Sequence, residues 1–309
     1  MTLSFSKEIG GYFELELNSI YNNIPKDVNS ARNALRYIVK AYEIKEIYIP
    51  FYTCPIVWKI LEENCKINFY HIDDNFMPTK DFQQDDYVLY TNYFGTCAKN
   101  VKYLADKYSN LIVDNAQAFY MPKYGIASFN SIRKFFGVSD GSLLYSDKTL
   151  NEDLEQDTSY QRCSHLLKRI DVNATFGYSD FVKNDDSLID ETIKRMSNLT
   201  TKIFNSINVN DAKIKRLENF KYLHKYLSKT NELKVELDAD DVPMVYPFLI
   251  KNENLRSKLI ENKIYVAKYW SELPVEYYEN YLCKYLLPLP IDQRYNLENM
   301  KKICEVIDV

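Results

Sequence analysis

The chain has 309 residues, of which 46% are hydrophobic and 27% charged, and acidic residues outnumber basic ones by 43 to 39. This length and composition predict a soluble globular protein of one or two domains. The net charge of −4 gives no electrostatic footprint for DNA or RNA, and no apolar run is long enough to span a bilayer. We therefore expect neither a nucleic-acid partner nor a membrane partner.

Several common kinds of site are also excluded. Only seven residues are glycine, and the sequence contains neither the G-x-G of dinucleotide-binding loops nor a Walker-type G-x-x-x-x-G-K-[ST]. The three histidines lie far apart, which argues against a histidine-rich metal site. The six cysteines form no C-x-x-C, and the first residues lack the pattern of a signal peptide. We therefore expect reduced thiols in a cytoplasmic protein.

The first part of the chain alternates strand-like runs with helical patterns. The runs are rich in β-branched and aromatic residues, whereas the helical segments place apolar residues at helical spacing. In chain order we predict helix Ala31–Tyr42, strand Ile47–Pro50, helix Pro55–Asn64, strand Lys66–Ile72, strand Tyr87–Tyr93, helix Ala98–Ser109 and strand Leu111–Asp114. Strands separated by helices predict an α/β three-layer sandwich with a mostly parallel sheet covered on both faces.

The alternation of strands and helices ends after residue 114. Strand-like segments Ile126–Ser131 and Ser142–Ser146 are too close together for a covering helix, so we predict sheet neighbours with one strand running against the rest. Residues 151–210 are weakly patterned, with helical stretches at Ser164–Arg169 and Leu188–Ile203. The pattern restarts with helix Ala212–Ser228, strand Pro243–Ile250, helix Leu255–Asn262, strand Ile264–Tyr269 and helix Leu297–Ile307. This restart predicts a large domain over 1–210 and a smaller C-terminal α+β domain over 211–309.

Two residues stand out at the predicted carboxyl edge of the sheet, where open parallel sheets bind their ligands. Asp114 directly follows a buried Leu-Ile-Val run, and an unpaired carboxylate there would be costly. Lys134 lies between Arg133 and two phenylalanines, surroundings that favour the neutral amine that a Schiff base requires. The residues alone leave a second interpretation open, in which Asp114 is a helix cap or turn residue and Lys134 is solvated.

The run from Asp114 to Gly141 resembles the core of the pyridoxal 5'-phosphate (PLP) enzymes of fold type I. It is most similar to the DegT/DnrJ/StrS family of sugar aminotransferases. Its first part, Asp114-Asn115-Ala116-Gln117-Ala118, fits that family's D-x-A-[QH]-[AS] segment. The later part fits a segment S-F-x(n)-K before an acidic residue and glycine, through Ser128-Phe129, Lys134 and Asp140-Gly141. Weaker likenesses in the same order are Ser30–Leu35, Pro50–Thr53 and Asn92–Gly95.

The resemblance implies a cofactor, PLP, and roles for the site residues. Lys134 would bind the cofactor as a Schiff base and then act as acid and base, while Asp114 would pair with the pyridinium nitrogen. Gln117 would contact the ring hydroxyl or the ring face. The phosphate would lie at the start of the helix that begins at Ala31, with Arg32, Asn33 and Ser128 or Ser131 around it. Tyr52 and Tyr93 would line the ring or the substrate side, with packing as the alternative role.

Three departures from the family pattern bear on activity. Ala31 replaces a glycine of the helix-opening turn, and Cys54 replaces the aromatic residue that often stacks on the ring. The spacing from Ser128 to Lys134 is one residue longer than usual, so Arg133 occupies the strict position; the distance to Asp140-Gly141 favours Lys134.

These observations predict a PLP-dependent aminotransferase that moves an amino group from an amino acid donor to a keto substrate, such as a nucleotide-linked keto sugar of surface polysaccharide biosynthesis. We expect a homodimer with shared active sites, in which residues 160–181 reach the partner. Tyr269-Trp270 is a candidate to close the pocket, with core packing as the alternative. Two other hypotheses remain: a relative that has lost transamination and serves as a binding or scaffold protein, and a PLP enzyme of another reaction type such as elimination.

Overall fold

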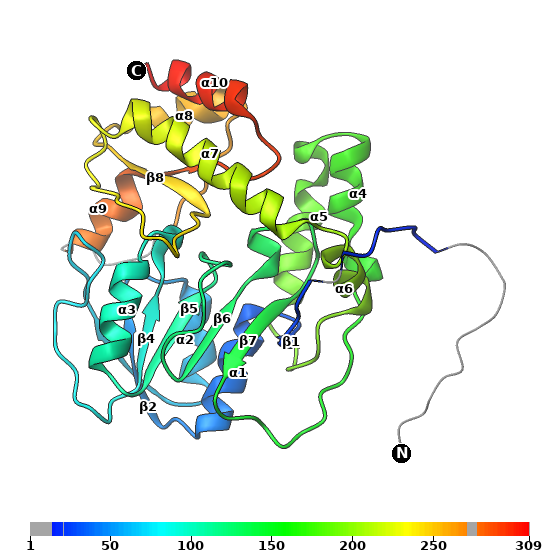
Figure 1. Ribbon diagram of the computed structural model, residues 1–309, viewed down its shortest axis with the longest axis vertical. Helices are drawn as coiled ribbons and strands as arrows, with labels where there is room; N and C mark the ends of the chain where they lie inside the picture. Colours follow the sequence, from blue (N-terminus) through cyan, green and yellow to red (C-terminus); the bar gives the residue numbers. More distant parts are fainter. Residues whose placement is uncertain (1–13, 21, 271–276, 309) are drawn as a thin grey trace.

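A seven-stranded sheet forms the centre of the protein (Figure 1). The computed structural model describes residues 14–20, 22–270 and 277–308. The strands lie in the order β1-β7-β6-β5-β4-β2-β3, and those from β6 to β3 run parallel. Their bounds are β1 Lys26–Val28, β2 Glu46–Pro50, β3 Lys66–Tyr70, β4 Val88–Thr91, β5 Leu111–Asn115, β6 Ala127–Asn130 and β7 Ser142–Ser146. Strand β7 pairs antiparallel with β6, as predicted, and the short edge strand β1 pairs antiparallel with β7.

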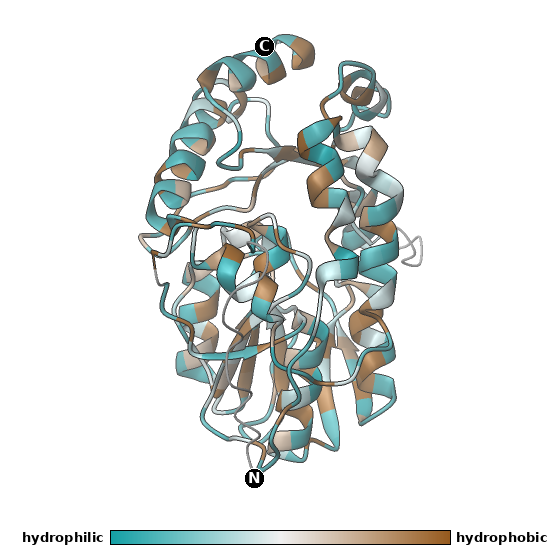
Figure 2. Ribbon diagram, turned by 90° about the vertical axis from the view of Figure 1, so that its right-hand side faces the viewer, coloured by the Kyte–Doolittle hydropathy of each residue, from teal (hydrophilic) through white to brown (hydrophobic). Residues whose placement is uncertain are grey.

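Helices cover both faces of this sheet, which confirms the predicted three-layer α/β sandwich. On one face, α1 (Ala31–Tyr42) and α2 (Pro55–Glu62) bury their apolar sides against β2, β4, β5, β6 and β7. On the other face, α3 (Ala98–Lys107) and α9 (Tyr278–Tyr285) contribute to a second core. Hydrophobic and hydrophilic segments alternate along the surrounding helices (Figure 2), as expected of helices that cover a core on one side.

Helix α1 brings its first turn to the carboxyl edge of the sheet. Ser30 caps the helix in extended conformation, and its side chain accepts a hydrogen bond from the Asn33 amide at 3.2 Å. The buried face includes Leu35 and Ile38, and the helix ends at Glu43 in the left-handed conformation. Its bounds are those that the sequence predicts, because the cap and the apolar spacing agree.

The C-terminal part forms a separate core, the C-terminal core, around a two-stranded antiparallel sheet of β8 (Val245–Leu249) and β9 (Leu286–Pro290). Helices α7 (Val209–Leu227), α8 (Leu255–Glu261) and α10 (Leu297–Ile307) surround it. The prediction of a strand over 264–269 is wrong. Ile264 and Val266 are both buried in this core, so they alternate like a strand, but the segment pairs with no described strand.

The middle of the chain forms α4 (Ser164–Asp171), α5 (Ala174–Ser187) and α6 (Asn198–Phe204), with the short 3₁₀ turn Tyr160–Arg162 before them. The prediction of one helix over 188–203 is wrong in its first half, because the helix starts only after the Ser197 cap, and α5 is not predicted at all. The domain division remains a prediction: Ala212 of α7 packs in a core with residues of β7 and α6, whereas Phe220 and Leu223 pack in the C-terminal core.

No helix within the described ranges combines the length and hydrophobicity that a bilayer crossing demands. Over those same ranges, no group of three or more His, Cys, Asp and Glu side chains is arranged to hold a metal ion.

Candidate active site

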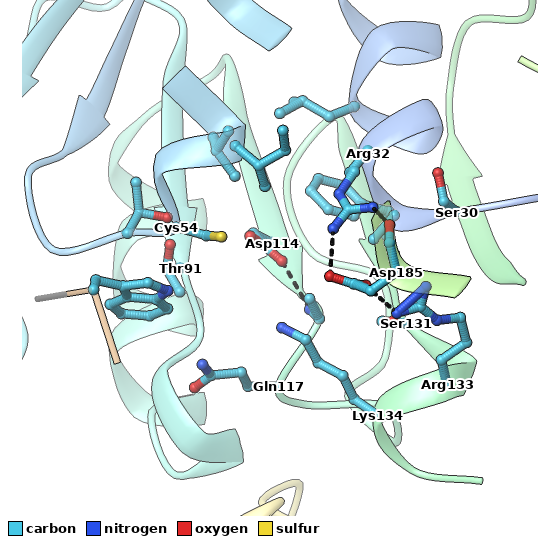
Figure 3. A pocket seen from close by; sticks show the side chains of 18 of the residues that line it. Ser30, Arg32, Cys54, Thr91, Asp114, Gln117, Ser131, Arg133, Lys134 and Asp185 are labelled. Carbon is cyan, nitrogen blue, oxygen red and sulfur yellow. Dashed lines mark hydrogen bonds and ion pairs between the residues drawn. The ribbon is translucent and has the colours of Figure 1, made fainter. Parts of the chain in front are cut away.

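A cavity of about 190 Å³ lies at the carboxyl ends of β4, β5 and β6, beside the first turns of α1 and α2 (Figure 3). The strand register brings Thr91, Asp114 and Phe129 to one level across three neighbouring strands. The polar side chains around the cavity are those of Ser30, Arg32, Thr53, Cys54, Thr91, Asp114, Gln117, Ser131, Arg133, Lys134 and Asp185. They come from widely separated parts of the sequence, and the sheet edge is what assembles them.

Asp114 is the buried acid of the site. Its side chain is 7% exposed, and one carboxylate oxygen accepts a hydrogen bond from the Ala116 amide at 2.8 Å. Burial raises the pKa of this carboxyl above its ordinary value, while the charge of Lys134 and the Ala116 hydrogen bond act in the opposite direction. The carboxylate thus lies in an environment that would stabilise a cation placed beside it.

Lys134 ends a short 3₁₀ turn, η2 (Ile132–Lys134), that follows β6. Its amine points into the cavity toward Asp114, whereas the neighbouring Arg133 turns away from Asp114 to Asp185 (Figure 3). The extra residue between Ser128 and Lys134 is thus taken up by the turn, which sends the two adjacent cations in different directions. Among the described residues, no side chain or carbonyl forms a hydrogen bond with the Lys134 amine.

The Asp140-Gly141 pair that follows this turn fixes it to the rest of the structure. Asp140 is fully buried and accepts hydrogen bonds from the amide and hydroxyl of Ser197, at 2.7 and 2.8 Å, and from the Thr200 hydroxyl. The Gly141 carbonyl accepts from the Ile132 amide at 3.1 Å. Asp140 therefore ties this segment to the capping residue and first turn of α6, and Gly141 closes the turn that carries Lys134.

Gln117 forms the wall opposite α1. Its side-chain oxygen accepts a hydrogen bond from the Phe94 amide at 2.7 Å, and its own carbonyl lies against Gly95. Phe94 and Gly95 both have positive φ, at 57° and 71°. The strand-end turn after β4 and the segment after β5 are thereby locked together beside the cavity.

A cationic cluster lies at the first turn of α1. Arg32 and Arg133 both form ion pairs with Asp185 of α5, the Arg32 pair at 3.1 Å, and each arginine side chain is 16% exposed. Ser30 and Ser131 line the same end of the cavity. Two arginines, two hydroxyls and a helix N-terminus form a group of donors suited to an anion.

Of the predicted site residues, six line the cavity: Ala31, Arg32, Asp114, Gln117, Ser131 and Lys134. Four do not. Because side chains alternate along a strand, Ser128 points away from the cavity face that Phe129 lines, and its buried hydroxyl has no hydrogen-bond partner. The Asn33 side chain instead donates to the Thr192 carbonyl at 2.7 Å and to the Asn29 side chain at 2.8 Å.

Tyr52 and Tyr93 are packing residues. Their rings stack on each other with centroids 5.6 Å apart, and the Tyr93 hydroxyl donates to the Tyr52 carbonyl at 2.8 Å. Both side chains are completely buried. Trp270, whose ring packs edge-on with that of Tyr52 at a centroid distance of 4.6 Å, lines the cavity, as Phe129 does.

Three further cavity residues were not assigned a site role from the sequence. Thr91 lies near the carboxyl end of the predicted strand Tyr87–Tyr93, and a search of strand ends for polar side chains would have found it. Cys54 lines the cavity at the start of α2, and its sulfur points into it (Figure 3). Asp185 lies 51 positions after Lys134 on a helix that the sequence did not predict, so no local pattern connects it with the site.

No family model matches the chain, and no curated protein matches it. Solved structures do. A DegT DnrJ EryC1 StrS aminotransferase from Brucella abortus is 12% identical with a TM-score of 0.62, over 92% of this chain and 84% of that one. NtdA from Bacillus subtilis with bound cofactor PMP is 15% identical with a TM-score of 0.63, over 92% and 73%. DesI in the presence of its TDP-sugar product is 13% identical with a TM-score of 0.59, over 91% and 79%. The chain thus has the fold of these aminotransferase structures.

Proposed function

We propose that this protein is a PLP-dependent aminotransferase that moves an amino group from an amino acid donor to a keto substrate. The observation that carries the proposal is the placement of the Lys134 amine facing the buried Asp114 carboxylate at the carboxyl edge of a parallel sheet. Asp114 is buried whereas Lys134 is exposed, so the direction of the amine toward the carboxylate, and not burial of the lysine, is what favours this role. The fold shared with aminotransferase structures supports the same conclusion.

The residues around the cavity fit PLP in three respects. Asp114 is a buried acid whose carboxylate, among the described residues, accepts a hydrogen bond only from the Ala116 amide, and a protonated ring nitrogen would balance its charge. Lys134 supplies an amine with no hydrogen-bonded partner there, as an aldehyde-binding lysine needs. The cluster of Arg32, Arg133 and Ser131 at the α1 N-terminus supplies donors for a phosphate.

When bound, PLP supplies an electron sink for the carbon that exchanges its amino group. Asp114 would hold the ring nitrogen in its protonated state through its carboxylate. Lys134 would hold the cofactor covalently and, once released, its amine would move a proton at the α carbon of the donor. Gln117 and Trp270 would confine the ring from the side opposite α1 and limit the access of water.

The test is direct uptake of the cofactor. Protein incubated with PLP should absorb in the visible region, and borohydride reduction followed by peptide mass mapping should place the adduct on Lys134. Lys134→Ala should abolish the adduct, whereas Lys45→Ala, an exposed lysine at the opposite end of the sheet, should retain it. A protein that stays colourless with PLP would contradict the proposal.

For the acceptor, we propose a nucleotide-linked keto sugar of surface polysaccharide biosynthesis. DesI, which shares the fold, has a structure with its TDP-sugar product. The cavity of about 190 Å³ is small beside ligand pockets of ~300–1,000 Å³. A nucleotide would therefore lie outside it. Amination assays with nucleotide-linked keto sugars against simple 2-keto acids distinguish the two substrate classes.

A second candidate function is a catalytically altered binding or scaffold protein of the same fold. Cys54 supports it, because a small thiol lines the cavity where the family often has a stacking aromatic residue. This hypothesis expects no half-reaction with any amino donor even after PLP is bound. A colour change on addition of glutamate would contradict it.

We further propose that the protein is a cytoplasmic homodimer with the α4–α5 hairpin at the interface. Large apolar side chains of the hairpin are exposed, among them Leu167 at 56%, Ile170 at 81% and Phe176 at 57%. Light scattering should give twice the chain mass. Ile170→Lys should yield monomers, whereas Ile214→Lys, which changes a 56% exposed isoleucine of α7, should not.

A further inference from the structure

Asp185 occupies the cationic end of the cavity. One oxygen of its carboxylate lies 3.1 Å from Arg32 and the other pairs with Arg133 (Figure 3). Arg32 also donates to the Asp185 backbone carbonyl at 3.0 Å. The two arginines come from α1 and η2, and the carboxylate comes from the last turn of α5. A single acidic residue therefore holds three separate segments together at this point.

Within the ion-paired group of Arg32, Arg133 and Asp185, the charges are not balanced. Arg32 and Arg133 carry two positive charges, and Asp185 provides one negative charge. Burial lowers the pKa of Arg133; the carboxylates of Asp185 and Asp140 oppose this effect, and the charges of Arg32 and Arg162 add to it. A dianion in the same place would balance both guanidinium groups, which can each bind a phosphate through two N–H groups.

The remaining surroundings also suit an anion with several oxygens. Ser30 and Ser131 line this end of the cavity. Helix α1 starts here, with twelve residues of aligned peptide dipoles behind its first turn. Its first turn contains no acidic residue that would compete for the amides.

We propose that Asp185 is a built-in occupant of a phosphate site formed by Arg32 and Arg133, and that a phosphate monoester binds there by displacing the Asp185 carboxylate. The proposal deepens the proposed function, on which it rests only for the identity of the phosphate's bearer. It gives Arg133 a role that differs from that of Lys134, and it makes Asp185 a competitor that lowers the affinity for phosphate.

The contacts of the neighbouring α5 residues indicate which part of the helix would move when the Asp185 carboxylate is displaced. Asn184 donates from its side chain to the Ser139 carbonyl at 2.9 Å, and Leu188 is completely buried. These two contacts hold the end of the helix on either side of Asp185. Displacement therefore requires a side-chain rotation of Asp185, and the α5 helix stays in place.

The experiment measures binding of inorganic phosphate to the protein without PLP, by calorimetry at low ionic strength. Asp185→Asn removes the competing charge, and we expect phosphate affinity to rise about tenfold, because both guanidinium groups become free to bind the phosphate. Asp186→Asn makes the same charge change one residue away at an exposed position and should leave the affinity unchanged. Asp185→Glu keeps a competing carboxylate and should bind phosphate like the wild type.

The outcomes separate this proposal from the proposed function. Equal or weaker phosphate binding by folded Asp185→Asn protein, with folding checked by circular dichroism, would overturn the proposal. A tenfold gain for phosphate together with no Schiff base at Lys134 would overturn the proposed function and leave the phosphate site standing. Affinity for pyridoxal, which lacks the phosphate, should be the same in wild type and Asp185→Asn; a gain there would overturn displacement at the phosphate site.

Discussion

The two ends of the cavity are built in different ways. At one end, Asp114 and Lys134 lie twenty residues apart, on the ends of adjacent strands and the turn that follows. At the other end, Arg32, Arg133 and Asp185 come from three segments that nothing in the local sequence connects. The acid–amine pair is thus a product of the sheet edge, whereas the cationic cluster depends on where a helical hairpin docks.

This difference matters for what each end can tolerate. The positions of Asp114 and Lys134 are fixed by the backbone, because Asp114 is in a strand and Asp140, near the Lys134 turn, is bound to Ser197 of α6. The cluster is held by ion pairs of side chains that are partly exposed, with Asp185 itself 38% exposed. Ion pairs at such positions contribute little to stability. We therefore expect changes at the first end to abolish function and changes at the second to tune it.

The largest effect is expected for Lys134→Arg, which keeps the positive charge and removes the amine that forms a Schiff base. The half-reaction with an amino donor should slow by ~10³-fold or more, since both covalent and acid–base roles are lost. Stopped-flow absorbance measures it. Lys45→Arg, at an exposed position at the opposite end of the sheet, is the matched control and should retain the half-reaction. In Arg133→Lys, the adduct should still form at Lys134. An adduct that moves to position 133 would show that the strict family spacing prevails.

Asp114→Asn is expected to have the next largest effect. Loss of the carboxylate beside the ring nitrogen should lower kcat by ~10²–10³-fold, the size typical of a removed electrostatic contact. Titration with an amino donor after saturation with PLP measures it. A rate within threefold of the wild type would contradict the role proposed for Asp114.

The same variant makes a prediction for stability. Because burial raises the pKa of Asp114 in the folded state, its stabilising contribution is present below the ordinary value of 3.8 and is lost as the pH rises through the folded value. At neutral pH, Asp114→Asn protein without PLP should therefore melt at a higher temperature than the wild type. The difference should disappear under acidic conditions, which thermal unfolding at several pH values would detect.

A third variant tests whether Arg216 of α7 stabilises the turn that carries Lys134. Arg216 of α7 is 1% exposed and donates to the carbonyl of Phe135, the residue after Lys134, at 3.3 Å, and to the Met244 carbonyl at 3.0 Å. Its guanidinium also lies 4.5 Å from the Phe135 ring centre. Arg216→Met removes the partner of the Met244 carbonyl, while the Phe135 carbonyl still accepts from the Gln293 side chain at 2.8 Å. The change should lower the free energy of unfolding by ~1–3 kcal/mol. Arg169→Met, at an exposed position of α4, should leave it unchanged in denaturant titrations.

Much of the sheet is predictable from the sequence because its strands are buried on both sides and read as continuous apolar runs. Strands β1 and β9 are not. The first has only three residues, and the second contains Pro288 and Pro290, which the edge position of a two-stranded sheet tolerates. Ile264 and Val266 give the opposite error, since burial alone produces the alternation of a strand.

The site residues also fall into those that the sequence predicts and those that it does not. Asp114, Lys134 and Gln117 are found from local motifs because the carboxyl edge of a sheet collects strand-end residues. Ser128 shows the limit of such motifs, because one step along a strand reverses the direction of a side chain. Asp185 lies beyond any local motif, because its place depends on how α5 docks on α1, which only tertiary packing determines.

The smallest effect concerns the glycines that the sequence keeps near the site. Gly95 has φ of +71°, and a Cβ there would lie 2.8 Å from the carbonyl oxygens of Gln117 and Val242. Gly95→Ala should therefore lower the free energy of unfolding by ~1–2 kcal/mol and loosen the wall that Gln117 forms. Gly137 is the matched control, because its Cβ would meet only a Leu166 methyl group at 3.9 Å. Gly137→Ala should stay within ~0.5 kcal/mol of the wild type in urea titrations. Equal effects at the two positions would mean that backbone conformation beside Gln117 does not constrain the acid–amine end of the cavity.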